Sequence, residues 1–288
     1  MKSLTAARTA GDGQDLVTTL GGHAVPLRAR SAVMLVLISI AGLAMFCWPL
    51  LTHHDASGSA HVTDAPIIFA VTLPLLVFVI LAEFADGGMD SKALAMLGVL
   101  SAVDAALRPT GGGTGGIETV FFLLILAGRV FGPGFGFVLG CTSLFASALI
   151  TAGVGPWLPF QMLCSAWIGM GAGLLPRRVR GTREIVMLIG YGIVSAYLFG
   201  ALMNLYSWPF LAGADISGHA NLAYSSAYSL LENLHRFGVY TLVTSTGGWD
   251  TGRAITNAVA IAVLGRPVLV VLRRAARRAS YDLVRSAD

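Results

Sequence analysis

Charged side chains are scarce in this chain. They account for 12% of its 288 residues, against 55% for hydrophobic residues, whereas a soluble domain carries about 25% charged residues. The scarcity excludes an ordinary soluble fold and predicts an all-α, polytopic bundle of transmembrane helices in a lipid bilayer. The formal charge of +4 does not indicate nucleic-acid binding, because the basic residues lie at the ends of apolar segments rather than on one surface.

Cysteines and catalytic motifs are sparse as well. The three cysteines lack CxxC spacing and fall inside apolar runs as small core residues: Cys47, Cys141 and Cys164. The sequence has no His-Glu-x-x-His helix, no Gly-x-Ser-x-Gly elbow and no carboxylate pair at metal spacing. Neither an enzyme nor a cofactor or metal site is therefore predicted, and the three histidines between residues 53 and 61 are interpreted as solvated. The first 30 residues also lack an apolar stretch long enough for a cleavable signal peptide.

Eight apolar windows predict membrane crossings. A spanning helix needs about 20 residues, so the fourth window is short and we expect its neighbours to shelter its ends. The windows are Ser31–Leu51, Pro66–Glu83, Ser91–Leu107, Ile117–Val130, Phe135–Thr151, Leu158–Leu175, Glu184–Leu205 and Ala254–Leu272.

Basic residues predict the orientation of these crossings. Clusters at residues 2–30, 177–183 and 273–285 fall on one face when the crossings alternate, and the positive-inside rule makes that face cytoplasmic. Both termini are then cytoplasmic in the cell membrane. On the opposite side lies the longest connection, Tyr206–Arg253, whose periodic stretch 222–243 is interpreted as a surface helix rather than a ninth crossing.

A glycine-rich polar break separates the third and fourth crossings. It runs from Arg108 to Thr119, and its glycines would allow backbone amides to approach a ligand closely. Such breaks in transporters often mark binding sites, which makes Arg108, Thr110 and Glu118 candidate substrate-binding residues. An ion pair that only closes the loop is an equally good interpretation, with either Glu118 or Asp104 as the partner of Arg108.

Further candidate residues lie at the outer ends of other helices. Asp250, Arg253 and Asn257 share one face at the start of the last crossing, although Asp250 alone is typical of a helix N-cap. Interfacial polar and aromatic residues are usually structural, but as a set they could form an apolar pocket with polar anchors for a planar ring. That set is Trp157, Gln161, Asn204, Tyr206 and Trp208.

Small residues at spacing four recur on three of the predicted helices. This spacing permits close helix packing in lipid, and it occurs in Gly98/Ala102/Ala106, Gly132/Gly136/Gly140 and Ser165/Gly169/Gly173. Packing within the bundle is the simpler interpretation of each stripe. The alternative for Gly98/Ala102/Ala106 is a face that docks another membrane subunit.

The short fourth helix, the turn Gly132-Pro-Gly-Phe-Gly136 and the segment Thr244-Ser-Thr-Gly-Gly-Trp-Asp250 together resemble the substrate-binding S component of energy-coupling factor (ECF) importers. The resemblance covers about Ser91 to Arg278. It implies a six-helix core in residues 89–288 with a basic cytoplasmic tail, preceded in residues 1–88 by a cytoplasmic tail and two accessory transmembrane helices. It also implies that the Gly98/Ala102/Ala106 face contacts the coupling subunit.

The same resemblance implies a mechanism. An S component captures a vitamin or related micronutrient outside and delivers it with a transmembrane coupling subunit and two cytoplasmic ATPases. The sequence agrees in having no phosphate-binding loop, because Gly111–Gly116 is not followed by lysine. Outer aromatics favour a flat heterocyclic or corrin-like cargo. Nickel and cobalt are disfavoured, because related metal importers carry histidine at the position that Lys2 holds here. The alternative function is a self-contained permease or a membrane scaffold without ATPase partners.

Overall fold

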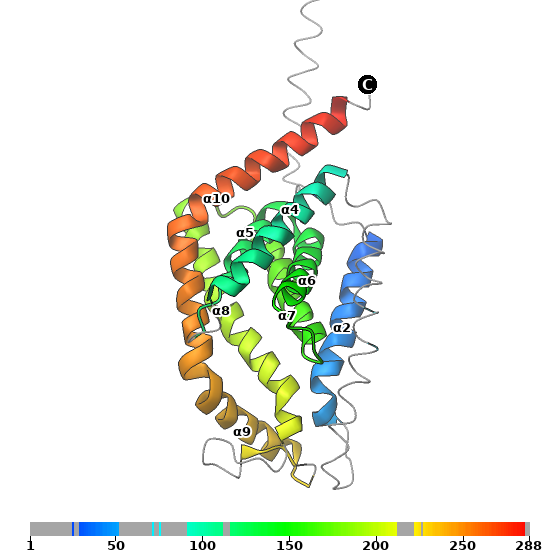
Figure 1. Cartoon of the computed structure of the whole chain (residues 1–288), viewed down its shortest axis with the longest axis vertical. Coiled ribbons are helices and arrows are strands. Elements are labelled where there is room, and N and C mark those ends of the chain that lie inside the picture. The colour runs from blue at the N-terminus through cyan, green and yellow to red at the C-terminus, as the bar shows by residue number, and fades with distance from the viewer. Residues whose placement is uncertain are drawn as a thin grey trace, which may run out of the picture.

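The computed structural model describes residues 25, 29–51, 71, 75, 91–111, 116–211, 222–225 and 227–285, and within these ranges the chain is helical with no strand. Figure 1 shows the helices packed as one elongated bundle. Their bounds are α2 Ala29–Leu51, α4 Ser91–Leu107, α5 Val120–Phe131, α6 Pro133–Ile150, α7 Leu158–Leu174, α8 Thr182–Ser207, α9 Leu230–Thr241 and α10 Thr251–Arg285. The all-α transmembrane bundle predicted from composition is confirmed. The predicted second crossing, Pro66–Glu83, lies outside the described residues apart from two positions.

Helix α5 forms the centre of the bundle. It has only 12 residues, and all of them except Val130 are buried. Helices α6, α7, α8 and α10 all pack against it. The short window in the sequence therefore corresponds to a short helix that its neighbours enclose, as predicted, and its ends are kept from lipid.

Two small-residue stripes interlock where α6 meets α7. A Cβ atom on Gly136 would lie 2.3 Å from the carbonyl oxygen of Gly169, and one on Gly169 would lie 2.2 Å from the carbonyl oxygen of Gly136. A Cβ atom on Gly140 would lie 2.5 Å from the backbone of Ser165 and Ala166. Glycine is required here because the two backbones touch, which confirms these stripes as packing within the bundle.

The turn between α5 and α6 depends on Gly132 and Pro133. Gly132 has φ 108°, a left-handed value that side chains disfavour. Pro133 is the first residue of α6, where a missing amide hydrogen costs nothing. The sharp turn predicted from Gly132-Pro-Gly is present.

The last helix begins earlier than the sequence windows predict. Ser229 caps α9 by accepting a hydrogen bond from the backbone amide of Glu232, the Ser-x-x-Glu arrangement of a capping box. From α9 the chain continues without a break through a π-helical segment, Leu242–Asp250, into α10. The predicted surface helix in 222–243 is therefore helical from Leu230 onward but extends the last crossing rather than lying apart from it (Figure 1).

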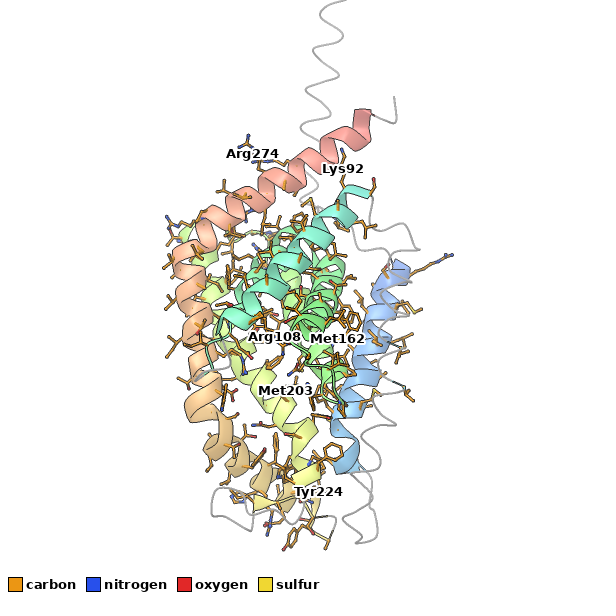
Figure 2. The ribbon with its side chains drawn as sticks, viewed as in Figure 1. Lys92, Arg108, Met162, Met203, Tyr224 and Arg274 are labelled. Atoms are coloured by element: carbon orange, nitrogen blue, oxygen red, sulfur yellow. The ribbon has the colours of Figure 1, made fainter. Side chains whose placement is uncertain are left out.

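The two ends of the bundle differ in chemistry. Figure 2 shows Lys92 and Arg274 at one end and Tyr224 at the other. At the basic end, Glu184 accepts hydrogen bonds from Arg129 of α5 at 2.8 Å and from Arg273 of α10 at 2.6 Å. Arg129 also donates to the carbonyl oxygens of Leu175, Pro176 and Val179. These charge-assisted bonds tie three helices together at that end.

Candidate functional site

The glycine-rich break leads the chain back toward the π-helical segment. The hydroxyl of Thr119 donates to the carbonyl oxygen of Leu107 at 2.8 Å, which joins the two ends of the break and satisfies a helix C-terminal carbonyl. Gly116 has φ 79°, and a Cβ atom there would lie 2.1 Å from the carbonyl oxygen of Trp249. The loop can approach Trp249 only with glycine at 116, and this approach brings Glu118 to the start of α10.

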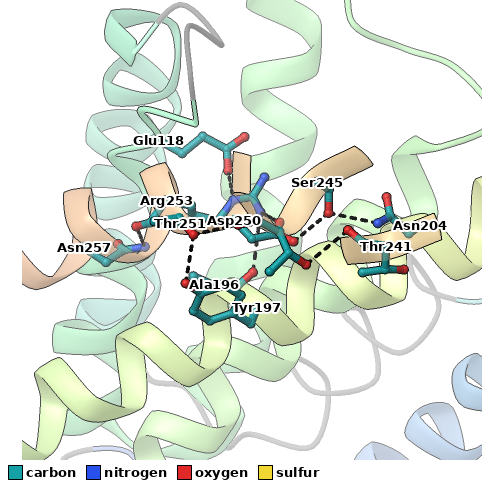
Figure 3. A network of polar contacts seen from close by, with 11 residues as sticks. Glu118, Ala196, Tyr197, Asn204, Thr241, Ser245, Asp250, Thr251, Arg253 and Asn257 are labelled. Carbon is teal, nitrogen blue, oxygen red and sulfur yellow. Dashed lines mark hydrogen bonds and ion pairs between the residues drawn. The ribbon is translucent and has the colours of Figure 1, made fainter. Parts of the chain in front are cut away.

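A row of polar side chains begins at Glu118 and runs from α10 through the π-helical segment to α8 (Figure 3). Arg253 donates from Nε to Glu118 and from Nη1 to Asp250, the latter at 2.8 Å. Ser245 donates to the other oxygen of Asp250 at 2.6 Å and accepts from Asn204 at 2.9 Å. The row thus joins residues from four parts of the chain that sequence separates by up to 135 positions.

Two features allow the Asp250 carboxylate to lie inside the bundle. Only 1% of its surface is exposed, and a Cβ atom on Gly200 of α8 would lie 1.9 Å from its Oδ1 atom, so a side chain at this position would displace the carboxylate. The π-helical turn supplies the second feature, because its wider backbone turns Ser245 and Asp250 toward α8. Such π segments are rare and often occur at functional sites.

Beside this row lies a cavity of about 280 Å³, near the lower end of the range of about 300–1,000 Å³ for small-molecule sites. Figure 2 places Met203, one of its lining residues, between Arg108 and the end that holds Tyr224. The lining combines polar groups with two aromatic rings, as ligand sites require. It consists of Gly200, Met203, Asn204, Tyr240, Thr244, Ser245, Trp249, Asp250 and Arg253.

Three of the residues predicted from the sequence line this cavity, namely Asn204, Asp250 and Arg253. Glu118 lies directly behind them as the ion partner of Arg253. Asn257 follows one turn deeper: its amide nitrogen donates to the carbonyl oxygen of Arg253 at 3.0 Å, and its buried oxygen has no partner among the described residues. These five predicted residues therefore belong to one connected site.

Arg108, the first residue of the glycine-rich break, contacts Gln161 of α7. Arg108 donates to the side-chain oxygen of Gln161 at 3.0 Å. Arg108 and Glu118, the loop-closing pair considered from the sequence, interact electrostatically, but the direct ion pair of Glu118 is with Arg253. Asp104, the other partner considered for Arg108, is fully buried beside Ser143 of α6.

The two predicted tryptophans are not among the residues that line the cavity. Trp208 is fully buried and donates from its indole nitrogen to the carbonyl oxygen of Leu222 at 2.8 Å, within an apolar cluster that includes Tyr224. Trp157 is 44% exposed and its ring covers Gly155 in the α6–α7 turn. Of Thr110, only the backbone is described. Of the set of outer polar and aromatic residues predicted from the sequence, Asn204 lines the cavity and the two tryptophans do not.

Sequence reasoning did not assign Tyr240, Ser245 and Trp249 to the site, although all three line it. The available signal was the segment Thr244–Asp250, whose two adjacent glycines in a hydrophobic chain mark unusual backbone. Nothing in the amino-acid pattern distinguishes a π-helical segment from the loop that was expected there.

The third small-residue stripe, Gly98/Ala102/Ala106, is exposed along α4. A Cβ atom on Gly98 would meet no atom within 4 Å. The opposite face of α4 is buried and contacts α6, with Ser101 hydrogen-bonded to Thr142 at 2.7 Å. Among the described residues, no helix covers the stripe, in contrast to the stripes of α6 and α7.

Comparison with family models gives one finding. The model described as "ECF transporter, substrate-specific component" matches residues 92–247, more than half of the chain. The protein belongs to this family. It is an S subunit of an ECF transporter, a multi-pass membrane component rather than an enzyme. Neither a curated protein nor a solved structure matches the chain.

The matched range contains most of the cavity lining and the whole α4 stripe. Membership in the family implies a small-molecule substrate, a transmembrane coupling subunit and ATPase partners. The match ends at residue 247, so Asp250 and Arg253 are assigned to the site by their contacts alone.

Proposed function

We propose that this S component captures a vitamin or related micronutrient in the cavity between α8, the π-helical segment and α10. The row Glu118–Arg253–Asp250, in which Arg253 and Asp250 are buried and Glu118 is half-buried, supports this proposal most directly. Charges inside a membrane protein are costly and are retained where they serve transport. The cavity beside them also has the mixed lining of aromatic and polar groups that a small ligand needs.

The proposal includes an outward-facing cavity. Basic residues gather at the end of the bundle where Lys92 and Arg274 lie, whereas the cavity lies toward the opposite end (Figure 2). The positive-inside rule assigns the basic end to the cytoplasm. Both termini are then cytoplasmic, and substrate reaches the cavity from outside the cell.

The proposal also assigns the α4 stripe to the coupling subunit. Small residues allow a partner helix to approach the backbone closely, and close contact drives helix association in lipid. The stripe is exposed on a helix whose other face is anchored to α6. Two cytoplasmic ATPases would then supply the energy that this chain cannot obtain by itself.

Uptake in cells tests the proposal as a whole. The chain is expressed with and without the coupling subunit and ATPases, and the small molecules that copurify with it are identified by mass spectrometry. We expect a bound small molecule in both cases and uptake of that molecule only with the partners. Ala102→Leu should block association with the coupling subunit but leave the copurifying molecule bound. Uptake without partners would contradict the proposal and indicate a self-contained permease.

A further inference from the structure

The basic end of the bundle holds positive charge that the side chains described there do not balance. Glu184 is the one carboxylate among those side chains, and it is already bound by Arg129 and Arg273. Five further arginines at this end are exposed, and none of them has an ion-pair partner among the described residues. We call these five the arginine surface: Arg178, Arg180 and Arg183 around the start of α8, and Arg274 and Arg277 in α10.

The start of α8 is fastened directly to α10. Arg266 of α10 donates to the hydroxyl of Thr182 at 2.7 Å, and Arg273 donates to Glu184 at 2.6 Å. Thr182 and Glu184 belong to the first turn of α8, so both parts of the arginine surface lie on adjoining elements. The fold therefore holds like charges together, although they repel one another, and an anion from outside the described residues would stabilise the arrangement.

Helix α10 places its arginines directly after an exposed apolar face. Val270 and Val271 are 62% and 64% exposed, and Arg274 follows them at spacings of four and three, hence on the same face. In a membrane protein such valines face acyl chains, and an arginine one turn further reaches the level of the lipid headgroups. Pro267 lies inside the helix, and Figure 1 shows α10 changing direction toward its C-terminal end, so these last turns cross the basic end of the bundle.

We propose that the arginine surface binds the headgroups of anionic phospholipids. A guanidinium donates two parallel hydrogen bonds to a phosphate group, and clustered arginines at a membrane surface attract lipids of net negative charge. A zwitterionic lipid offers the same phosphate but carries its own cation, so it is bound more weakly. The exposed valines beside Arg274 favour a lipid over a soluble anion, because they contact the acyl chains of the molecule whose phosphate the arginines hold. This surface is separate from the substrate cavity, which lies toward the other end of the bundle.

Lipid binding to the full-length protein in detergent provides the test. Phosphatidylglycerol and phosphatidylcholine with identical acyl chains are titrated separately, and the bound lipid is counted by native mass spectrometry. We expect phosphatidylglycerol to bind about tenfold more tightly or better. The difference should shrink in high salt, measured from the binding of radiolabelled lipid, because salt screens exposed charges. Equal binding of the two lipids at low salt would overturn the proposal.

Arg274→Gln tests whether the arginine surface causes the preference. The variant removes one exposed charge, so phosphatidylglycerol should bind about fivefold more weakly while phosphatidylcholine binding stays the same. Arg236→Gln is the matched control, because it removes one positive charge from α9 at the opposite end of the bundle, and it should change neither affinity. Thermal unfolding establishes that both variants are folded. Equal loss of phosphatidylglycerol binding in the two variants would show that net charge alone matters and would overturn the proposal.

Arg180→Gln provides a second variant on the other element of the arginine surface. It lies in the exposed connection before α8, where folding does not depend on its side chain, and it should weaken phosphatidylglycerol binding to a similar extent. Unchanged phosphatidylglycerol binding in both Arg180→Gln and Arg274→Gln would overturn the proposal. If the same two variants then copurify with less coupling subunit and ATPase, the surface binds an acidic protein partner instead of lipid.

Discussion

Helices α4 and α6 carry stripes of small residues with the same spacing but different surroundings. In α6, Gly136 and Gly140 touch the backbone of α7 so closely that a single added carbon would collide with it. In α4, Gly98 has open space around it, and Ala102 and Ala106 are exposed. The same local pattern therefore builds a core contact in one helix and leaves an unfilled contact surface in the other.

The difference teaches that spacing specifies close approach but not the partner. Small residues remove side-chain bulk, and a helix from the same chain or from another subunit can use the space. Helix α4 is held by its other face, where Ala93, Leu97 and Ser101 are buried. It can therefore present the stripe without relying on it for its own position.

Gly136→Leu should disrupt the contact between α6 and α7 and destabilise the protein, which is the largest effect expected of these changes. The new side chain would meet the α7 backbone, which cannot move without separating the helices, so we expect a loss of about 3 kcal/mol or more. Thermal unfolding and monodispersity in detergent measure it. Gly98→Leu, the same change in the exposed stripe of α4, should leave the thermal stability and the monodispersity unchanged. Equal destabilisation by the two variants would contradict the distinction between the stripes.

Gly98→Leu should instead break association with the coupling subunit. A leucine in the middle of the stripe holds the partner helix away, and we expect association and uptake to fall by about tenfold or more. Gly190→Leu on α8 is the matched control, because this glycine is also exposed with no atom near its missing Cβ. If both leucines weaken association equally, added bulk in the lipid-facing surface explains the result and α4 is not the docking face.

Asn257→Ala and Arg108→Ala should have the smallest effects and leave both stripes intact. Asn257 positions the backbone of Arg253, and Arg108 holds Gln161 beside the glycine-rich break. We expect each change to weaken substrate binding about threefold, with normal membrane insertion and normal association with the coupling subunit. Equilibrium binding of the copurifying molecule measures the effect. Unchanged affinity in both variants would remove these residues from the site.

The sequence predicts the described helices well because apolar length is what a bilayer demands. Ser91–Leu107 has the same bounds in sequence and structure, and the short fourth window is the enclosed helix α5. Helical spacing places Asp250, Arg253 and Asn257 on one face, because such spacing acts over one or two turns and can be counted in a sequence.

Long-range contacts could not be predicted in this way. The carboxylate that binds Arg253 belongs to Glu118, which is 135 positions away. Proximity in the sequence instead favours Arg108 as the partner of Glu118. Trp208 is typical of an interfacial aromatic, but the loop at Leu222 encloses it. The sequence predicts a connection for residues 244–250, which the structure shows as π-helical, because adjacent glycines suit both a loop and a widened helix.

Cysteine labelling at Trp249 tests the central claim most directly, namely that the cavity beside Asp250 receives substrate from outside the cell. Trp249 lines the cavity and is 46% exposed. In the parent chain Cys141 and Cys164 are buried and Cys47 of α2 is half-buried, so labelling of the parent chain is subtracted as the background. In intact cells, a membrane-impermeant maleimide should label Trp249→Cys, and the copurifying molecule should slow that labelling. Labelling that requires permeabilised cells, or that the bound molecule does not slow, would contradict the account.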